Sequence, residues 1–182
     1  MFDKIGKNNG KGVKMDFYEV IKKRRSIRGY EDRAVEEDKL KRILEAARIA
    51  PSAANRQPWY FVVVKREDVK ENLKGAYNKE WFWKAPVIIC ACGIEKEAWR
   101  RKDGKSYLDV DVSIAMDHLI LSATAEGLGT CWIAAFDSSE VKRILNLPRG
   151  IEPIVLTPLG YPATSLKPFF RKPLEKIVEI ID

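Results

Sequence analysis

The chain has few of the side chains that most often perform acid–base, nucleophilic or metal chemistry. Among 182 residues there are one histidine and three cysteines. A zinc site needs four cysteine or histidine ligands at a recognisable spacing, and the sequence has no such pattern. His118 lies in a mostly apolar stretch, which favours a packed core histidine, and Cys90 and Cys92 lie in an apolar run typical of a buried strand. We therefore predict neither a metal site nor a catalytic side chain.

Two further classes of site are missing from the sequence. No G-x-G-x-x-G follows a predicted strand and there is no G-K-[ST], so neither a Rossmann dinucleotide site nor a P-loop is predicted. No apolar run approaches the roughly 20 residues that cross a bilayer, and the N-terminus lacks the apolar core of a signal peptide. These absences predict a cytoplasmic protein without a membrane partner.

Positive charge is present in excess but is not gathered on one face. The net charge is +7, and residues 1–14, a Gly/Asn/Lys-rich stretch with no periodicity, carry nearly half of it. Elsewhere Lys, Arg and Glu alternate as on an ordinary solvated surface, so no nucleic-acid partner is predicted. We expect a disordered basic tail over 1–14 and a single domain over 15–182, long enough to bury a core without disulfides.

Hydrophobic periodicity predicts a succession of helices and strands. Asp16 with Glu19 marks one helix start, and Asp137 with Glu140 marks another. The stretch 59–64 is apolar throughout, as in a strand inside a covered sheet, and 109–126 is apolar on most sides, as in a helix buried nearly all round. The other predicted helices span 36–50 and 68–75, and the other predicted strands span 87–92, 154–157 and, at an edge, 176–181.

Four polar stretches remain once the predicted core is set aside: 24–28, 51–57, 127–136 and 167–173. In the first, Arg24, Ser26 and Arg28 alternate, so in an extended backbone all three point to one side. Guanidinium groups bind phosphate or carboxylate with two hydrogen bonds at once. Taken alone, the stretch is more typical of a solvated basic surface, and a binding role depends on the other three stretches.

The other stretches add complementary groups. Asn55 and Gln57 carry paired donors and acceptors suited to the edge of a heteroaromatic ring. Arg171 and Lys172 form a second basic pair that can share an anion with Arg24. A charged segment over 95–105 predicts a surface flap. Its Trp99 and the following Tyr107 either stack on a substrate or pack on the body of the protein.

Four motifs follow one another along the chain. They are Arg24-Arg-Ser-Ile-Arg28, Ala50-Pro-Ser-Ala-Ala-Asn-Arg-Gln-Pro-Trp59, Gly127-Leu-Gly-Thr-Cys-Trp-Ile133, and Gly160-Tyr-Pro162 followed by Arg171-Lys-Pro-Leu174. Together, over residues 16–178, they resemble the FMN-dependent nitroreductase family. The resemblance implies an α+β fold, a three-layer sandwich whose central, mostly antiparallel sheet is flanked by helices. It also implies an intertwined homodimer with two FMN sites across the interface, in which the C-terminal segment reaches over the partner.

The resemblance also assigns roles to individual residues. Arg24, Ser26 and Arg171 would hold the FMN phosphate, and Arg28 would lie near the N1–O2 edge of the flavin ring. Because Phe169 stands where a second basic residue can occur, Arg25 or Lys172 would take its place. The remaining flavin contacts would come from Pro51, Ser52, Ala53 and Asn55 of the other subunit and from the backbone amides of Ile133, Ala134 and Ala135, which would face N5. Gln57 is a further candidate for binding the cofactor.

The implied activity is that of an NAD(P)H-dependent FMN oxidoreductase. NADH or NADPH would reduce the flavin, leave, and be replaced by a nitroaromatic, quinone or similar acceptor in a ping-pong cycle through N5. FMN carries the redox chemistry, while the protein supplies orientation and electrostatics. Two alternatives stay open on the same fold: a flavin-consuming or dehalogenating enzyme, and a non-catalytic FMN-binding redox module.

Overall fold

A computed structural model describes residues 15–163 and 169–181. The predicted disordered tail over 1–14 lies outside the described residues, as do the first two positions of the stretch 167–173. Within the described residues, no helix is both long and apolar enough to cross a membrane.

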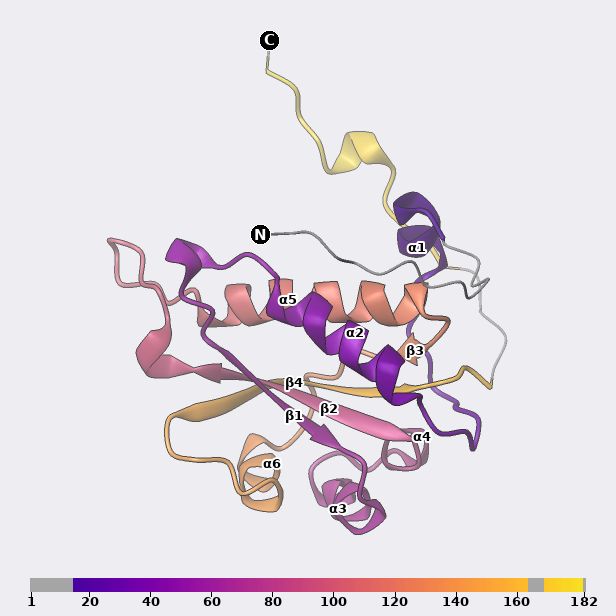
Figure 1. The fold of residues 1–182 in the computed structure, drawn as a ribbon. Coiled ribbons are helices and arrows are strands. Elements are labelled where there is room, and N and C mark those ends of the chain that lie inside the picture. Colours follow the sequence, from indigo (N-terminus) through magenta and orange to yellow (C-terminus); the bar gives the residue numbers. More distant parts are fainter. Residues whose placement is uncertain (1–14, 164–168, 182) are drawn as a thin grey trace, which may run out of the picture.

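A four-stranded antiparallel sheet forms the middle of the molecule (Figure 1). Its strand order is β1-β2-β4-β3, so the two longest strands lie at the centre. β2 runs from Val87 to Ile94 and β4 from Ile151 to Gly160, while the outer strands are β1 (Trp59–Val64) and β3 (Gly129–Thr130). The predicted strands 59–64, 87–92 and 154–157 are thereby confirmed, and so is the antiparallel sheet of the predicted α+β fold.

Helices cover both faces of this sheet and complete the three predicted layers (Figure 1). The helices α2 (Glu37–Arg48) and α5 (Leu108–Ala125) pack on one face, where they share a core with Ile89 and Val155. The other face packs against α3 (Glu67–Asn72), α4 (Glu80–Trp83) and α6 (Ser138–Ile144). α1 (Phe17–Lys23) contacts α5 and lies beside the C-terminal segment. Short 3₁₀ turns occupy Ala53–Asn55, Leu73–Gly75, Glu95–Glu97 and Leu174–Lys176.

Both predicted helix caps form. The carboxylate of Asp16 accepts hydrogen bonds from the amides of Tyr18 and Glu19 at the start of α1, and Asp137 does the same for Ser139 and Glu140 at α6. Each carboxylate satisfies amides that have no partner inside the helix. The local sequence alone therefore sets these two helix starts.

Three expectations about burial are wrong in this chain. β1 is an edge strand rather than a covered one, and Tyr60 on it is 45% exposed. α5 is not buried all round: Val110 is 41% exposed, and an outward face continues through Ile114 and His118. His118 is consequently half-buried on that face and not packed in the core. The single chain therefore leaves part of the apolar surface of β1 and of α5 exposed to solvent.

The predicted edge strand 176–181 does not form. After the turn at Leu174–Lys176 the chain is irregular, and its apolar residues are exposed, with Ile180 at 79% and Ile181 at 89%. A strand needs a neighbour to accept its hydrogen bonds, and none of the described strands pairs with this segment. β3 was not predicted, because the sequence Gly127-Leu128-Gly129 after a helical stretch resembles the end of a helix more than the start of a strand.

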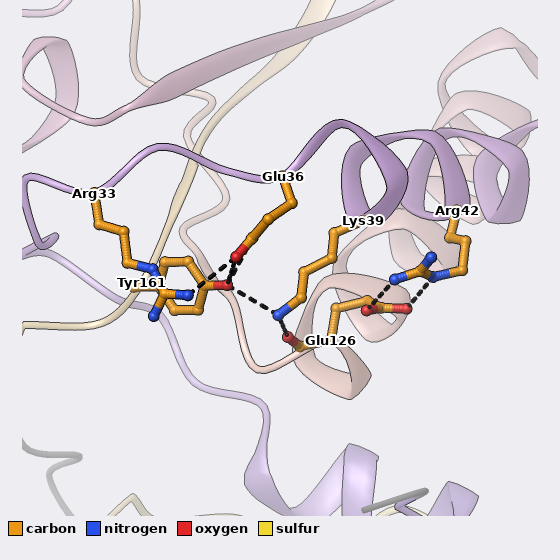
Figure 2. A network of polar contacts seen from close by, with 6 residues as sticks. All are labelled: Arg33, Glu36, Lys39, Arg42, Glu126 and Tyr161. Carbon is orange, nitrogen blue, oxygen red and sulfur yellow. Dashed lines mark hydrogen bonds and ion pairs between the residues drawn. The ribbon is translucent and has the colours of Figure 1, made fainter. Parts of the chain in front are cut away.

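A network of polar contacts ties the start of α2 to the ends of α5 and β4 (Figure 2). The hydroxyl of Tyr161 donates to the carboxylate of Glu36 at 2.7 Å and accepts from Lys39 at 2.9 Å. Lys39 also donates to the carbonyl of Glu126 at 2.8 Å, and Arg42 forms two hydrogen bonds with the Glu126 carboxylate. Hydrogen bonding from Tyr161 lowers the pKa of Glu36 to about 2.

Replacing Tyr161 by phenylalanine tests this network. A carboxyl whose pKa is lowered in the folded state stabilises the protein above its ordinary pKa of 4.5 and loses that contribution as the pH falls toward 2. We expect Tyr161→Phe to lower the melting temperature at pH 7 by about 2–4 °C, and this difference should shrink between pH 4.5 and 2. Calorimetric melting across that range measures it.

Tyr60→Phe is the matched control, because the side chain of Tyr60 lies exposed on β1 and takes no part in the network. A melting difference for Tyr161→Phe that stayed constant from pH 7 to pH 2 would contradict the assigned link to Glu36.

Candidate functional site

The arginine-rich segment is held against β3. Ser26 forms a parallel bridge with Thr130, and the amide of Ile27 donates to the Thr130 carbonyl at 2.8 Å. Gly129 permits this approach, because a Cβ there would come within 2.5 Å of the Ile27 side chain. The segment is thus extended, as the alternation of its polar residues requires.

Arg24, Ser26 and Arg28 all act on one thiol, that of Cys131. Burial raises the pKa of this thiol, while the positive charge of Arg28, a hydrogen bond with Ser26 and the charge of Arg24 lower it in part. The backbone of the segment lies against Thr130, the residue before Cys131. In an extended segment the alternation of Arg24, Ser26 and Arg28 puts their side chains on one side.

Arg25 has a different environment from its neighbours. Its guanidinium donates to the carbonyl oxygens of Lys22 at 2.6 Å and Arg24 at 2.8 Å. It also lies over the ring of Phe169, 3.6 Å from the centroid, and the guanidinium of Arg171 lies 4.3 Å from the same centroid. The C-terminal segment is thereby attached to the arginine segment. Lys172 follows Arg171 as an exposed residue.

Arg28 is placed beside α4. Its guanidinium lies 5.9 Å from the ring centroid of Trp81, next to a cavity of about 330 Å³ lined by Trp81, Tyr30, Gly29, Glu80 and Lys84. Burial raises the pKa of the Tyr30 hydroxyl above its ordinary value, and this hydroxyl donates to the carbonyl of Ile27 at 2.8 Å. Tyr30 therefore stays neutral at physiological pH and serves to fix the backbone between Ser26 and Arg28.

A larger cavity of about 650 Å³ also borders Tyr30, but its walls suit a phosphate less well. Its cations are matched by equal numbers of carboxylates: Arg33, Lys65, Lys70 and Lys84 face Glu31, Asp32, Glu37 and Glu67. Lys65 pairs with Glu37, and Lys70 with Glu67. This cavity offers little net charge to an anion, in contrast to the arginine segment.

The backbone after Cys131 continues along the same side of the molecule. The amide of Ile133 donates to the carbonyl of Leu156 at 2.9 Å, and Ile133 accepts one in return. Its N–H is therefore engaged within the chain and is not available to a ring nitrogen, contrary to the expectation for Ile133. Ala134 and Ala135 are exposed, so they are the two residues of this group that can present amides to a ligand.

The stretch 51–57 forms a strained loop with several anchors. Ala54, Asn55 and Gln57 have φ values of 52°, 53° and 51°, in the left-handed region that side chains disfavour. The Ser52 hydroxyl accepts from the amide of Gln57 at 2.8 Å. The amide of Ala53 donates to the Asp111 carboxylate at 2.9 Å. Such strain persists where surrounding contacts over-determine the backbone, and it is typical of ligand-binding loops.

This loop and the arginine segment lie at opposite ends of α5. Asp111 in the first turns of α5 holds the loop, whereas Thr130 beyond the last turn holds the arginine segment. An α5 of 18 residues is about 27 Å long. One chain therefore brings together three of the four predicted stretches, 24–28, 127–136 and the described part of 167–173, but not 51–57.

The flap is a short hairpin closed by its own aromatic residues. The rings of Trp99 and Tyr107 meet edge to face with centroids 5.0 Å apart, and the amide of Tyr107 donates to the Trp99 carbonyl. Both rings are half-buried. Arg56 joins the flap to the strained loop by donating to the Ala98 carbonyl at 3.1 Å. The two aromatic residues named as candidates for substrate contact thus pack against each other.

Sequence reasoning missed Asp111 and Trp81. Asp111 is 1% exposed, and its second carboxylate oxygen is buried without a hydrogen-bond partner among the described residues. The signal for it was present, because a carboxylate on the apolar side of a helix needs a polar partner. Trp81 gave no signal of its own, since one aromatic residue in W-F-W is indistinguishable from another before the fold is known.

Comparison with known proteins gives one family. The sequence profile of the nitroreductase family matches residues 21–77 and 73–161. A Methanothermobacter thermautotrophicus protein, provisionally named an NADH dehydrogenase/NAD(P)H nitroreductase, is 36% identical over 169 residues, which cover 86% of this chain and 83% of the relative. The human iodotyrosine deiodinase 1 is 28% identical over 198 residues, which cover 90% of this chain and 68% of that protein.

Solved structures of the same family superpose on the chain. A nitroreductase family protein of Clostridium difficile 630 has a TM-score of 0.83 and 38% identity, covering 91% of this chain and 98% of its own. An FMN-dependent nitroreductase of Clostridium difficile R20291 has a TM-score of 0.77 and 29% identity, covering 88% and 96%. The fold expected from the four motifs is therefore the fold observed.

Removing the Asp111 carboxylate tests the anchoring of the strained loop. Asp111→Ala removes the carboxylate that accepts the hydrogen bond of the Ala53 N–H. This loss should lower the free energy of unfolding by about 1–3 kcal/mol. Asp111→Asn retains an oxygen acceptor and should lose less. Urea unfolding measures both, and the exposed Asp109→Ala in the same helix turn should stay within about 0.5 kcal/mol of the wild type. Equal effects of Asp111→Ala and Asp109→Ala would show that the anchor is unimportant.

Proposed function

The chain belongs to the nitroreductase family, and we propose on this basis that it is an FMN-dependent oxidoreductase that uses NADH or NADPH to reduce nitroaromatics, quinones or similar small acceptors. The observation that carries the proposal is the extended arginine segment held against β3, along which Arg24, Ser26 and Arg28 alternate. Bound FMN would supply the redox chemistry by taking a hydride from the nicotinamide at N5 and passing its electrons to an acceptor in a ping-pong cycle.

The donor set fits the phosphate end of FMN. A phosphate is a permanent anion that accepts several hydrogen bonds, and guanidinium groups bind it with charge-assisted bonds. Arg24 and Ser26 present such donors on one side of the arginine segment. Arg171 belongs to the C-terminal segment, and its guanidinium lies over the same Phe169 ring as that of Arg25. In this arrangement Arg25 supports the site from its other side.

The residues next along the segment fit the ring end. Arg28, beside Trp81, would stabilise negative charge on the reduced ring more than the neutral oxidised ring. Ala134 and Ala135 would present backbone amides to the redox-active edge. No side-chain base or nucleophile is needed for this chemistry, which suits a chain whose single histidine lies on the outward face of α5.

A second copy of the chain would complete the site. The strained loop with Pro51, Ser52, Ala53, Asn55 and Gln57 lies an α5 length away from the arginine segment of its own chain, so it would serve the flavin of the partner. The C-terminal segment has the apolar exposure that such a homodimer would cover, with Leu174 at 69% and Ile177 at 65% exposed. The free edge of β1 would give this segment a strand to pair with.

A second candidate is reductive dehalogenation, which the similarity to iodotyrosine deiodinases favours. Bound flavin, reduced by NADH or NADPH, would supply two electrons. With one proton these would replace the carbon–halogen bond of a halophenol by a carbon–hydrogen bond and release the halide. Halide release during turnover with a halophenol, in the absence of nitro-group reduction, would assign this activity instead.

The direct test of the proposal is an anaerobic titration. The purified protein should be yellow, and NADH or NADPH should bleach the flavin band near 450 nm within one turnover. Addition of a nitroaromatic or quinone should restore the colour. A colourless protein that does not bind added FMN would remove the basis of the proposal, whereas bound FMN that no acceptor reoxidises would assign a non-catalytic flavin module.

Arg24 and Arg28 should affect different properties of the flavin. Arg24→Ala removes a charged hydrogen bond to the phosphate and should weaken FMN binding by about 1.5–3 kcal/mol, or about 10- to 150-fold. Arg28→Ala should change affinity less but lower the flavin midpoint potential by about 30–60 mV, since about 30 mV corresponds to 1.4 kcal/mol for two electrons. Fluorescence titration and anaerobic dye-coupled reduction measure the two quantities.

Arg149→Ala is the control for both variants, because Arg149 is exposed in the loop before β4 and lies in none of the four stretches. If Arg24→Ala and Arg28→Ala both matched Arg149→Ala, the assigned roles would be wrong even for a yellow protein.

Truncation tests the proposed dimer. A chain ending at Pro173 keeps Phe169 and Arg171 but lacks the exposed apolar residues Leu174, Ile177, Val178, Ile180 and Ile181. We expect the full chain to sediment as a dimer and the truncated chain to dissociate at a concentration at least tenfold higher. Replacing the exposed Glu179 by alanine should leave dimerisation unchanged, and a truncated chain as tightly dimeric as the full chain would argue against this role of the segment.

A further inference from the structure

The flap borders the strained loop over 51–57 at two points. The amide of Ile94, the last residue of β2, donates to the carbonyl of Pro58 at 2.8 Å. The guanidinium of Arg56 donates to the carbonyl of Ala98 at 3.1 Å. Pro58 and Ala98 are both buried, so the base of the flap packs against the end of the loop.

The flap keeps its own shape through its backbone. Arg100 and Ser106 form an antiparallel bridge, and the amide of Tyr107 donates to the carbonyl of Trp99 at 2.9 Å. These hydrogen bonds close the hairpin, but they do not orient it toward another element. Among the described residues, the side-chain hydrogen bond that joins the flap to the loop is that of Arg56.

The backbone of Arg56 is itself held in place. Its amide donates to the carbonyl of Ala53 at 3.2 Å, and the amide of Ala53 donates to the buried carboxylate of Asp111. The neighbours Asn55 and Gln57 have left-handed φ values of 53° and 51°, and such strain is maintained by surrounding contacts. Because the backbone of Arg56 is fixed in this way, its guanidinium can fix the flap relative to the loop.

The flap lies one side chain away from residues that the proposed function places on the flavin. Asn55 and Gln57 flank Arg56 in the loop, which in the proposed homodimer serves the flavin of the partner. The nicotinamide and the acceptor would use the exposed face of that ring in turn. A segment held beside the ring would therefore limit the width of the acceptor that can stack on it, and selectivity among acceptors would follow from that fit.

We infer that Arg56 is a positioning residue that fixes the flap of one chain beside the flavin held by the other, and so restricts the site to acceptors with small ring systems. The inference rests on the proposed function, because it needs FMN between the loop of one copy and the arginine segment of the other. It adds a determinant of acceptor size that is none of the residues assigned to the flavin.

Two quinones of different size test the inference. The full-length protein with bound FMN is assayed anaerobically with a reduced nicotinamide and either para-benzoquinone, which has a single ring, or the wider phenanthrenequinone. Arg56→Ala should lower the ratio of kcat/KM for the small quinone to that for the large quinone about fivefold, the size expected from one lost hydrogen bond. FMN affinity should stay within about twofold of the wild type. A general loss of structure would lower both kcat/KM values together and leave their ratio unchanged.

Hydrogen exchange gives a second readout that does not depend on turnover. Without the Arg56 guanidinium the flap should open more often, so the amides of residues 99–107 should exchange faster in Arg56→Ala than in the wild type, both with FMN bound. The amides of α6, which packs on the sheet face opposite α5, should keep their wild-type rates.

Two further variants define the contribution of the guanidinium. Arg56→Lys keeps a charged donor on a long side chain and should retain most of the size preference and of the flap protection. Arg66→Ala is the matched control, since Arg66 is an exposed arginine that pairs with Asp68 and lies in neither the loop nor the flap. Arg66→Ala should leave the quinone ratio and the flap exchange unchanged.

The outcomes separate the inference from the proposed function. If the wild-type protein reduces quinones through bound FMN and Arg56→Ala keeps the wild-type ratio, the inference is overturned while the proposed function stands. A changed ratio with unchanged flap exchange overturns it as well, since Arg56 would then act through another element, and so do equal changes in Arg56→Ala and Arg66→Ala. If the wild-type protein does not bind FMN, the proposed function fails first and the inference fails with it.

Discussion

Helix α5 sets the distance between the two ends of this molecule, and the arrangement of the polar groups depends on that distance. One end fixes the strained loop over 51–57 through the buried carboxylate of Asp111. The other end, through Gly127 and Gly129, leads into the short strand that holds the arginine segment. A rigid helix of 18 residues cannot bring these ends together. On the proposed function, a flavin that contacts both would lie between two copies of the chain.

Repulsion between like charges opposes the folding of the arginine segment when no anion is bound. Arg24 and Arg28 lie on one side of an extended backbone, and Arg171 is attached nearby through Phe169, so like charges are concentrated there. The Cys131 thiol and the Tyr30 hydroxyl do not supply a counter-charge, because burial raises the pKa of both. A bound phosphate would supply it. The site is in this sense prepared for a negatively charged group.

Much of the fold follows from local sequence. The caps at Asp16 and Asp137, the apolar stripe of α2 and the apolar runs of β1, β2 and β4 each depend on neighbouring residues, and each was predictable. What failed depends on partners distant in sequence or outside the chain. The edge position of β1, the outward face of α5 with His118 and the unpaired segment 176–181 cannot be read from local periodicity, since an apolar residue looks the same whether its own chain or another covers it.

The candidate site was predictable in part for the same reason. Motif order indicated four stretches, and alternation indicated that Arg24, Ser26 and Arg28 share a side. The local sequence did not indicate that Arg25 would lie on Phe169, or that the Ile133 amide would be used by β4. Those contacts join residues more than 20 positions apart, so only the packed fold reveals them.

The attachment of Phe169 and Arg171 to the arginine segment has a consequence for biosynthesis. A ribosome makes the arginine segment early and these two residues almost last, so a nascent chain carries the cationic strand long before it carries the ring that braces it. Products of premature termination contain most of the core but not this brace. A chain that ends before Phe169 therefore leaves the Arg25 guanidinium without the aromatic ring on which it lies.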